Sequence, residues 1–133
     1  IGEDQIWLLN VSKNIKKGVS LSDALYYYRI RNNSVVHSNI WNEKKMSEVY
    51  AREKMVELTE KFYPSLSRYA HVKYRNCLNA VGLSLFKGRQ FKELKGVSRY
   101  CRRYVSDYIK SPSVSMINKL KAVLLQIVCF IFS

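Results

Sequence analysis

Residues 66–88 read LSRYAHVKYRNCLNAVGLSLFKG, and their apolar side chains recur every three or four positions. This spacing places the apolar side chains along one face of an α-helix and the polar ones along the other. Gly88 follows the last apolar position, where a glycine commonly ends a helix. The segment therefore predicts an amphipathic helix. Its apolar stripe consists of Leu66, Tyr69, Ala70, Tyr74, Cys77, Leu78, Val81 and Leu85.

Three further helices are expected around this segment. Residues 41–63 show helical periodicity, and Pro64 ends it. Another helix is expected from about Arg89, and a last one after the break at residues 111–113. Their expected apolar positions are Val49, Val56 and Tyr63 in the first, Phe91, Leu94, Val97, Cys101, Tyr104, Val105 and Tyr108 in the second, and Ile117, Leu120, Leu124, Ile127, Val128 and Ile131 in the third.

The N-terminal part of the chain reads differently. The spacing from Asp4 to about Asn14 predicts one short helix. Residues 19–21 and 24–30 are rich in aliphatic and Tyr side chains, which favour extended segments, and residues 32–34 then indicate a loop. The expected fold is mainly α, with a short α/β start followed by about four helices.

The chain has 133 residues and a formal net charge of +13, which favours anionic partners. Residues 87–121 alone carry ten basic and two acidic side chains, so the charge is concentrated there. Arg99, Arg102 and Arg103 lie among tyrosines in this segment. Such a mixture suits either a nucleic-acid backbone or a membrane interface, and a solvated helix face is the plainer alternative. Because an apolar helix follows directly, an anionic membrane is the preferred functional partner.

Cys77, Cys101 and Cys129 lie at wide spacing, outside any CxxC or Cys/His arrangement. They are predicted to be buried thiols of a reducing cytosol. Residues 122–132 are apolar except for Gln126, yet eleven residues are fewer than the roughly 20 that span a bilayer. This segment is expected to lie on a membrane, to pack into a core, or to continue beyond Ser133.

The N-terminal segment carries an ordered set of motifs. Gly2-Glu3-Asp4 opens the first helix, which also carries Trp7, and a Leu-Tyr-x-Tyr-Arg segment at residues 25–29 is followed by Ser34. In this order the motifs resemble those of the bacterial family 2 glycosyltransferases. The resemblance covers residues 2–38 and implies that residues 1–38 form the C-terminal edge of a GT-A (Rossmann-like) catalytic domain. Residues 39–133 would form a helical C-terminal region.

The resemblance also implies the roles of individual residues. Asp4 would be the general base of an inverting, hexosyltransferase-like sugar transfer, and Glu3 would orient it or contact the acceptor. Trp7 would bind substrate. Tyr28, Arg29 and Ser34 would line the site of the donor diphosphate. His37 is a candidate metal ligand, with a surface or hydrogen-bonding histidine as the alternative.

Members of that family first supply a nucleotide-binding half and an Asp-x-Asp segment that holds Mg²⁺ or Mn²⁺ against the sugar nucleotide. Neither feature is present in this sequence. We therefore expect this chain to be the C-terminal part of a longer, cytoplasmic enzyme of surface polysaccharide biosynthesis, such as that of a capsule, peripheral to the inner face of the cell membrane. Its partners would be a nucleotide-sugar donor and a lipid-linked or saccharide acceptor, and a second copy in a homodimer is a further candidate partner. The chain alone would hold no metal.

A non-enzymatic alternative also accounts for the charge and the helices. In that interpretation the chain is a basic helical module that binds nucleic acid or a partner protein. It predicts polynucleotide binding with a strong dependence on salt concentration. It does not account for the order of motifs from Gly2 to Ser34.

Overall fold

A computed structural model of the chain describes residues 3–23 and 44–131. The described residues are mainly helical and contain no strand, so the expectation of a mainly α fold is confirmed for them. The elements are α1 (Glu3–Ser12), α2 (Lys44–Phe62), a 3-10 turn η1 (Pro64–Leu66), α3 (Ser67–Lys87), α4 (Phe91–Ser98), α5 (Val105–Lys110) and α6 (Met116–Ile131).

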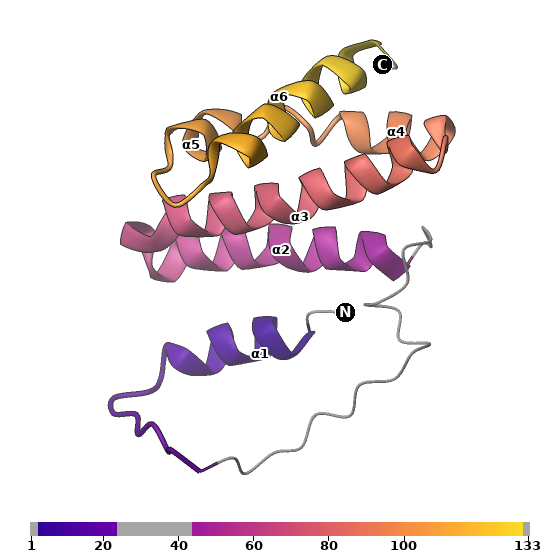
Figure 1. Cartoon of the computed structure of the whole chain (residues 1–133). Helices are drawn as coiled ribbons and strands as arrows, with labels where there is room; N and C mark the ends of the chain where they lie inside the picture. The colour runs from indigo at the N-terminus through magenta and orange to yellow at the C-terminus, as the bar shows by residue number, and fades with distance from the viewer. Residues whose placement is uncertain (1–2, 24–43, 132–133) are drawn as a thin grey trace.

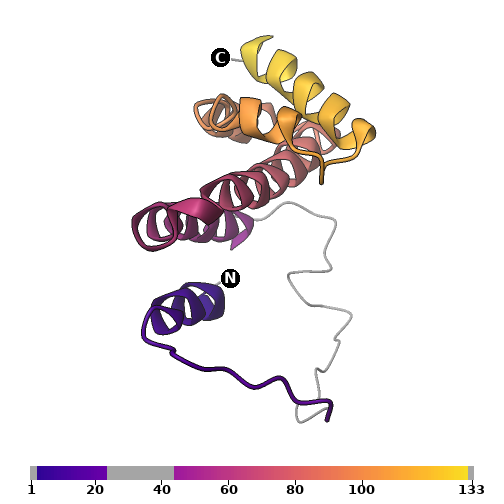
Figure 2. The same cartoon turned by 90° about the vertical axis from the view of Figure 1, so that its left-hand side faces the viewer.

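The helices are arranged in successive layers (Figure 1). Helices α2 and α3 lie side by side and are joined by the short turn η1. Helices α4, α5 and α6 cover the opposite side of α3, whereas α1 packs against α2 (Figures 1 and 2). Helix α3 therefore lies at the centre of the stack and contacts most of the other elements.

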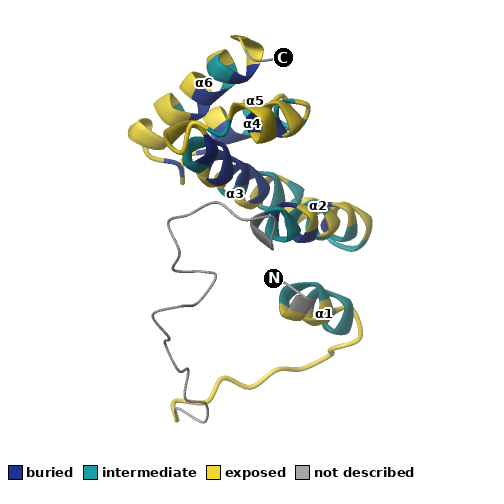
Figure 3. Ribbon diagram, turned by 90° about the vertical axis from the view of Figure 1, so that its right-hand side faces the viewer, coloured by how far each residue is buried: buried dark blue, intermediate teal, exposed yellow. Residues whose placement is uncertain are grey.

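The core lies where α2, α4 and α6 meet the buried face of α3 (Figure 3). The expected apolar positions of α2 and of the central helix supply much of it, which confirms the helical periodicity of residues 49–85. The main buried cluster consists of Val49, Val56, Tyr74, Leu78, Val81, Leu85, Leu94, Val97, Cys101, Leu125 and Cys129. A smaller cluster consists of Val72, Tyr108, Val114 and Ala122.

The helix expected from Arg89 onward is in fact two helices, α4 and α5. Between them the backbone forms turns of three residues, which are tighter than those of an α-helix. The backbone N–H of Tyr100 donates to the carbonyl oxygen of Val97, and that of Arg103 donates to the carbonyl oxygen of Tyr100. Tyr104 then adopts a left-handed conformation with φ of 56°. Its ring stacks on His71 with centroids 3.9 Å apart. This tertiary contact offsets the cost of a left-handed residue and breaks the helix.

The extended segment expected at residues 19–21 is not a strand. Val19 and Leu21 are 87% and 63% exposed, and the described parts of the chain provide no second strand to pair with them. A strand requires such a neighbour to satisfy its backbone groups. The second expected extended segment, at residues 24–30, lies outside the described residues.

Helix α6 packs through a face that the apolar pattern did not indicate. Most of the expected stripe points outward: Ile117, Leu120, Leu124, Ile127 and Ile131 are 52–68% exposed. The buried face consists of Ala122, Leu125 and Cys129. Two of these three side chains are small, so the helix approaches α3 more closely through this face than the larger residues of the stripe would permit.

Gly82 marks the close approach of α3 and α6. A Cβ atom at this position would lie 2.7 Å from Cδ1 and Cδ2 of Leu125. Leu125 is itself buried and has little room to move aside. By contrast, Gly96 in α4 has nothing within 4 Å of the position of a Cβ atom.

We predict that Gly82→Ala and Gly96→Ala change stability in opposite directions. Gly82→Ala should lower the free energy of unfolding by about 1–3 kcal/mol, because the new methyl overpacks the contact with Leu125. Gly96→Ala should raise it by about 0.5–1 kcal/mol, because alanine is the better helix former at an open site. Urea unfolding followed by circular dichroism measures both. A Gly82→Ala variant at least as stable as Gly96→Ala would contradict this packing of α6 on α3.

Candidate functional site

Helix α1 carries the predicted catalytic residues, and contacts near its C-terminal end hold it on α2. The hydroxyl groups of Ser12 and Tyr63 are 3.1 Å apart, and the Lys13 ammonium lies 4.9 Å from the centroid of the Phe62 ring. Beneath the helix, Leu9 faces an apolar cavity of about 180 Å³. The cavity is also lined by Arg52, Met55, Thr59, Tyr63, Leu66, Tyr69, Ala70 and Lys73.

Asp4 lies in the first turn of α1 and is exposed. Trp7 and Leu8 follow it by three and four residues, so the three side chains share one face of the helix. Trp7 is 64% exposed and Leu8 58%. The partial positive charge of a helix N-terminus stabilises a carboxylate in this position. An accessible carboxylate beside an accessible indole can contact a molecule that carries several hydroxyl groups.

Most of the other predicted catalytic and substrate-binding residues lie outside the part of the chain that the structure describes. Tyr28, Arg29, Ser34 and His37 lie outside the described residues, as does the side chain of Glu3. Of the predicted catalytic and substrate-binding residues, Asp4 and Trp7 are therefore the two whose side chains the structure describes, and they lie together.

The three arginines predicted to contact an anion have different surroundings. Arg103 forms an ion pair with Glu53 of α2, and this interaction raises its pKa despite partial desolvation. The Arg103 and Arg99 guanidinium groups lie 5.3 and 4.9 Å from the centroid of the Tyr100 ring. Arg102 is exposed and lies beside α6. Arg99 and Arg102 are thus better placed to meet an external anion than Arg103, whose charge Glu53 offsets.

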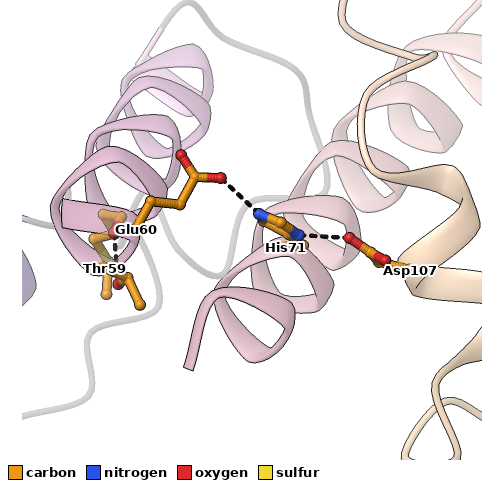
Figure 4. A network of polar contacts seen from close by, with 5 residues as sticks. Thr59, Glu60, His71 and Asp107 are labelled. Atoms are coloured by element: carbon orange, nitrogen blue, oxygen red, sulfur yellow. Dashed lines mark hydrogen bonds and ion pairs between the residues drawn. The ribbon is translucent and has the colours of Figure 1, made fainter. Parts of the chain in front are cut away.

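A polar cluster that the sequence did not reveal joins three helices. In the His71 clamp, defined here as Glu60, His71 and Asp107, the two ring nitrogens of His71 lie 2.9 Å from Glu60 Oε1 and 2.6 Å from Asp107 Oδ2 (Figure 4). Which of the two nitrogens donates depends on the tautomer of the ring. The carboxylates come from α2 and α5, so the clamp ties these helices to α3.

The His71 clamp is better suited to a structural role than to catalysis. The imidazole is largely covered, with 12% of its side chain exposed, and Tyr104 stacks on its face. Both ring nitrogens are engaged by carboxylates, and little of the ring is open to a substrate. The sequence offered no signal for the clamp, since Asp107 lies 36 residues from His71 and the pairing depends on the packing of α5.

Arg75 is a second buried polar group that the sequence analysis missed. Its side chain is fully buried in α3, and burial lowers the pKa of its guanidinium. Nη1 donates to the carbonyl oxygen of Cys101, and Nη2 lies 3.4 Å from the carbonyl oxygen of Ala122. The Oε1 atom of Gln126 is 3.5 Å from Nη2. Arg75 thus links α3 to the segment after α4 and to α6.

Metal-binding groups and membrane-spanning helices are both absent from the described residues. Among residues 3–23 and 44–131, no three His, Cys, Asp or Glu side chains are grouped so as to hold a metal ion. Within the same ranges, no helix has the length and hydrophobicity needed to cross a bilayer.

Comparisons with protein-family models, with curated proteins and with solved structures found no match for this chain.

We predict that His71→Ala lowers the free energy of unfolding by about 1–3 kcal/mol. The substitution removes both hydrogen bonds of the clamp and the stacking partner of Tyr104. Arg68→Ala is the matched control, because Arg68 is an exposed residue of the same helix and its loss should change stability by less than about 0.5 kcal/mol. Urea unfolding of both variants measures the difference. Equal stability of the two variants would show that the clamp does not hold the helices together.

Proposed function

We propose that this chain is the C-terminal part of an inverting glycosyltransferase of family 2, and that Asp4 is its general base. The observation that carries the proposal is the position of Asp4, exposed in the first turn of α1 and on the same face as Trp7. The order of motifs from Glu3-Asp4 to Ser34 supports the same assignment. The contacts of Ser12 with Tyr63 and of Lys13 with Phe62 support the C-terminal end of the same helix.

In the proposed reaction, the Asp4 carboxylate takes the proton of the acceptor hydroxyl as the hydroxyl oxygen attacks the anomeric carbon of the donor sugar. The new carbon–oxygen bond forms on the face opposite the bond to the nucleoside diphosphate. That bond breaks, the diphosphate leaves with the electron pair, and the configuration at the anomeric carbon is inverted. Glu3 orients Asp4 or contacts the acceptor, and Trp7 offers an apolar surface to a sugar ring.

The donor would be held mainly by residues that precede this chain. Arg29 has the planar fork of donors that suits phosphate oxygens, and with Tyr28 and Ser34 it would close the diphosphate site. The divalent metal and the nucleotide would be bound by an upstream half with an Asp-x-Asp segment. This chain alone would then be inactive.

Peripheral attachment to an anionic membrane is the proposed location, and α6 is the proposed contact. Its outward face, here called the α6 stripe, consists of the exposed residues Met116, Ile117, Leu120, Val123, Leu124, Ile127, Phe130 and Ile131. The stripe is opposite the buried face of the helix. At 100° per residue, Lys119 and Lys121 lie along its two borders. Arg102 lines a cavity together with Ile127 and Phe130 of the stripe.

This arrangement of charge favours a lipid surface over a second copy of the chain. Cations that border an apolar face lie at headgroup depth when the apolar side chains enter the acyl region, and each contributes about 1 kcal/mol with anionic lipid. A second copy would bring together two surfaces of a chain with a net charge of +13. The α6 stripe would therefore lie in the plane of the membrane.

We predict that Asp4→Asn, made in the enzyme that includes its upstream half, lowers turnover about a hundredfold to ten-thousandfold and leaves donor binding nearly unchanged. Asparagine keeps the shape of the side chain but cannot accept the proton. Sugar transfer from a panel of nucleotide sugars is followed by mass spectrometry, and donor binding by calorimetry.

Asp23→Asn is the matched control for Asp4, because Asp23 is an exposed aspartate outside the helices. The control should retain full turnover. If the Asp4→Asn enzyme turns over as fast as the control, Asp4 is not the base.

We predict that Leu124→Asp weakens binding to vesicles of phosphatidylglycerol and phosphatidylcholine by about tenfold to a hundredfold, because it replaces an exposed leucine of the α6 stripe with a charged side chain that cannot enter the acyl region. Asn118→Asp is the matched control, since it adds the same charge at an exposed residue of α6 outside the stripe. Co-sedimentation with the vesicles measures both. Equal binding of the two variants, or binding of the wild type to neither anionic nor neutral vesicles, would exclude the stripe as the membrane contact.

The non-enzymatic alternative makes a different prediction. A polynucleotide-binding module would bind duplex or single-stranded DNA near physiological salt, with an affinity that falls steeply as salt rises. The glycosyltransferase proposal predicts weak binding under these conditions and no preference for base sequence. A titration at two salt concentrations therefore separates the two functions.

A further inference from the structure

Two cysteine side chains that are far apart in the sequence meet inside the bundle. The Sγ atoms of Cys101 and Cys129 are 2.7 Å apart, and both residues are buried. Cys101 follows α4, whereas Cys129 lies in the last turns of α6. The two thiols therefore lie within reach of a covalent bond between these two segments.

The two thiols differ in their readiness to react. The hydrogen bond with Cys101 and the charge of the Arg75 guanidinium lower the pKa of Cys129, although burial acts in the opposite direction. The same hydrogen bond and burial raise the pKa of Cys101. Because the thiolate is the nucleophile, these directions favour Cys129 as the group that attacks first and Cys101 as the group that resolves.

A small oxidant has a route to Cys129. The residue lines a cavity of about 270 Å³ between α4 and α6, which also borders on the exposed Arg102 and Phe130. Cys101 does not line this cavity and lies behind Cys129. Access from this side therefore agrees with the order of reaction that the electrostatics favour.

Cys77 provides an internal comparison. It is half-buried in α3, and burial raises its pKa to about 12. It is not part of the thiol pair. A thiol with a raised pKa is mostly protonated at neutral pH and reacts slowly with peroxide.

We propose that Cys101 and Cys129 are a redox modification site, at which hydrogen peroxide converts the two thiols into an intramolecular disulfide. In the first step, the Cys129 thiolate attacks one peroxide oxygen, the S–O bond forms as the O–O bond breaks, and hydroxide leaves. In the second step, Cys101 sulfur attacks the sulfenic acid of Cys129, the S–S bond forms as the S–O bond breaks, and the departing hydroxide takes the Cys101 proton as water. Two thiols lose two electrons, and one peroxide becomes two water molecules.

The disulfide would fix α6 to the segment that joins α4 and α5. The bond closes a loop that contains the whole of α5 and most of α6, which reduces the freedom of the unfolded chain. Helix α6 also carries the α6 stripe. Oxidation would therefore lock the position of the helix that presents this apolar surface.

The test uses the wild-type chain, so it does not depend on any variant folding. The protein is treated with hydrogen peroxide, unfolded, alkylated at its remaining thiols and digested. We expect peptide mapping to find Cys101 joined to Cys129 within one chain and Cys77 alkylated. The oxidised protein should unfold at a temperature about 10 °C higher than the reduced protein, and dithiothreitol should reverse the shift.

Two variants test the order of the steps. In Cys101→Ala, the sulfenic acid of Cys129 should persist and be captured by dimedone, whereas Cys129→Ala should give little captured product. Cys77→Ala should form the disulfide as the wild type does. Alkylation of all three cysteines after peroxide treatment, a disulfide that includes Cys77, or a disulfide between two chains would overturn the proposal. Capture of the sulfenic acid at Cys101 instead of Cys129 would do so as well.

Discussion

The C-terminal half of the bundle depends on the hydrogen bonds that the buried guanidinium of Arg75 donates. A charge removed from water costs several kcal/mol unless hydrogen-bond acceptors replace the solvent. Carbonyl oxygens of Cys101 and Ala122 supply part of this replacement, one from the segment after α4 and one from α6, whereas Nε of Arg75 finds no hydrogen-bond partner among the described residues. Burial lowers the pKa of Arg75, which is the expected sign for a cation in such surroundings. Arg75 thus ties both segments to α3 through one side chain.

This constraint accounts for the surfaces that the bundle presents. With Ala122 held at Arg75, α6 turns Ala122, Leu125 and Cys129 inward and most of its large apolar side chains outward. The same rotation brings Cys129 to Cys101. On the other side of the stack, α1 rests on α2 with Asp4 exposed (Figure 1). An enzyme attached to a membrane through the α6 stripe would thus hold its proposed base on the far side of the bundle.

Periodicity in the sequence was sufficient to predict the helices, because the apolar faces of α2 and α3 repeat over many residues. It failed where a tertiary contact decides the local structure. The break at Tyr104 depends on stacking against His71, and the rotation of α6 depends on Arg75 and Gly82. The His71 clamp and the thiol pair join segments far apart in the sequence, so no local pattern could reveal them. Asp4 and Trp7 were predicted from motifs, and helical spacing alone places them on one face.

The proposed glycosyltransferase activity is tested most directly by the gene itself. The most direct measurement is the nucleotide sequence upstream of the codon for Ile1. We expect it to encode, in frame, a nucleotide-binding half that contains an Asp-x-Asp segment before the Glu3-Asp4 motif. An initiator codon immediately before Ile1 would leave no room for a donor site and would contradict the assignment of Asp4 as the base of a glycosyltransferase.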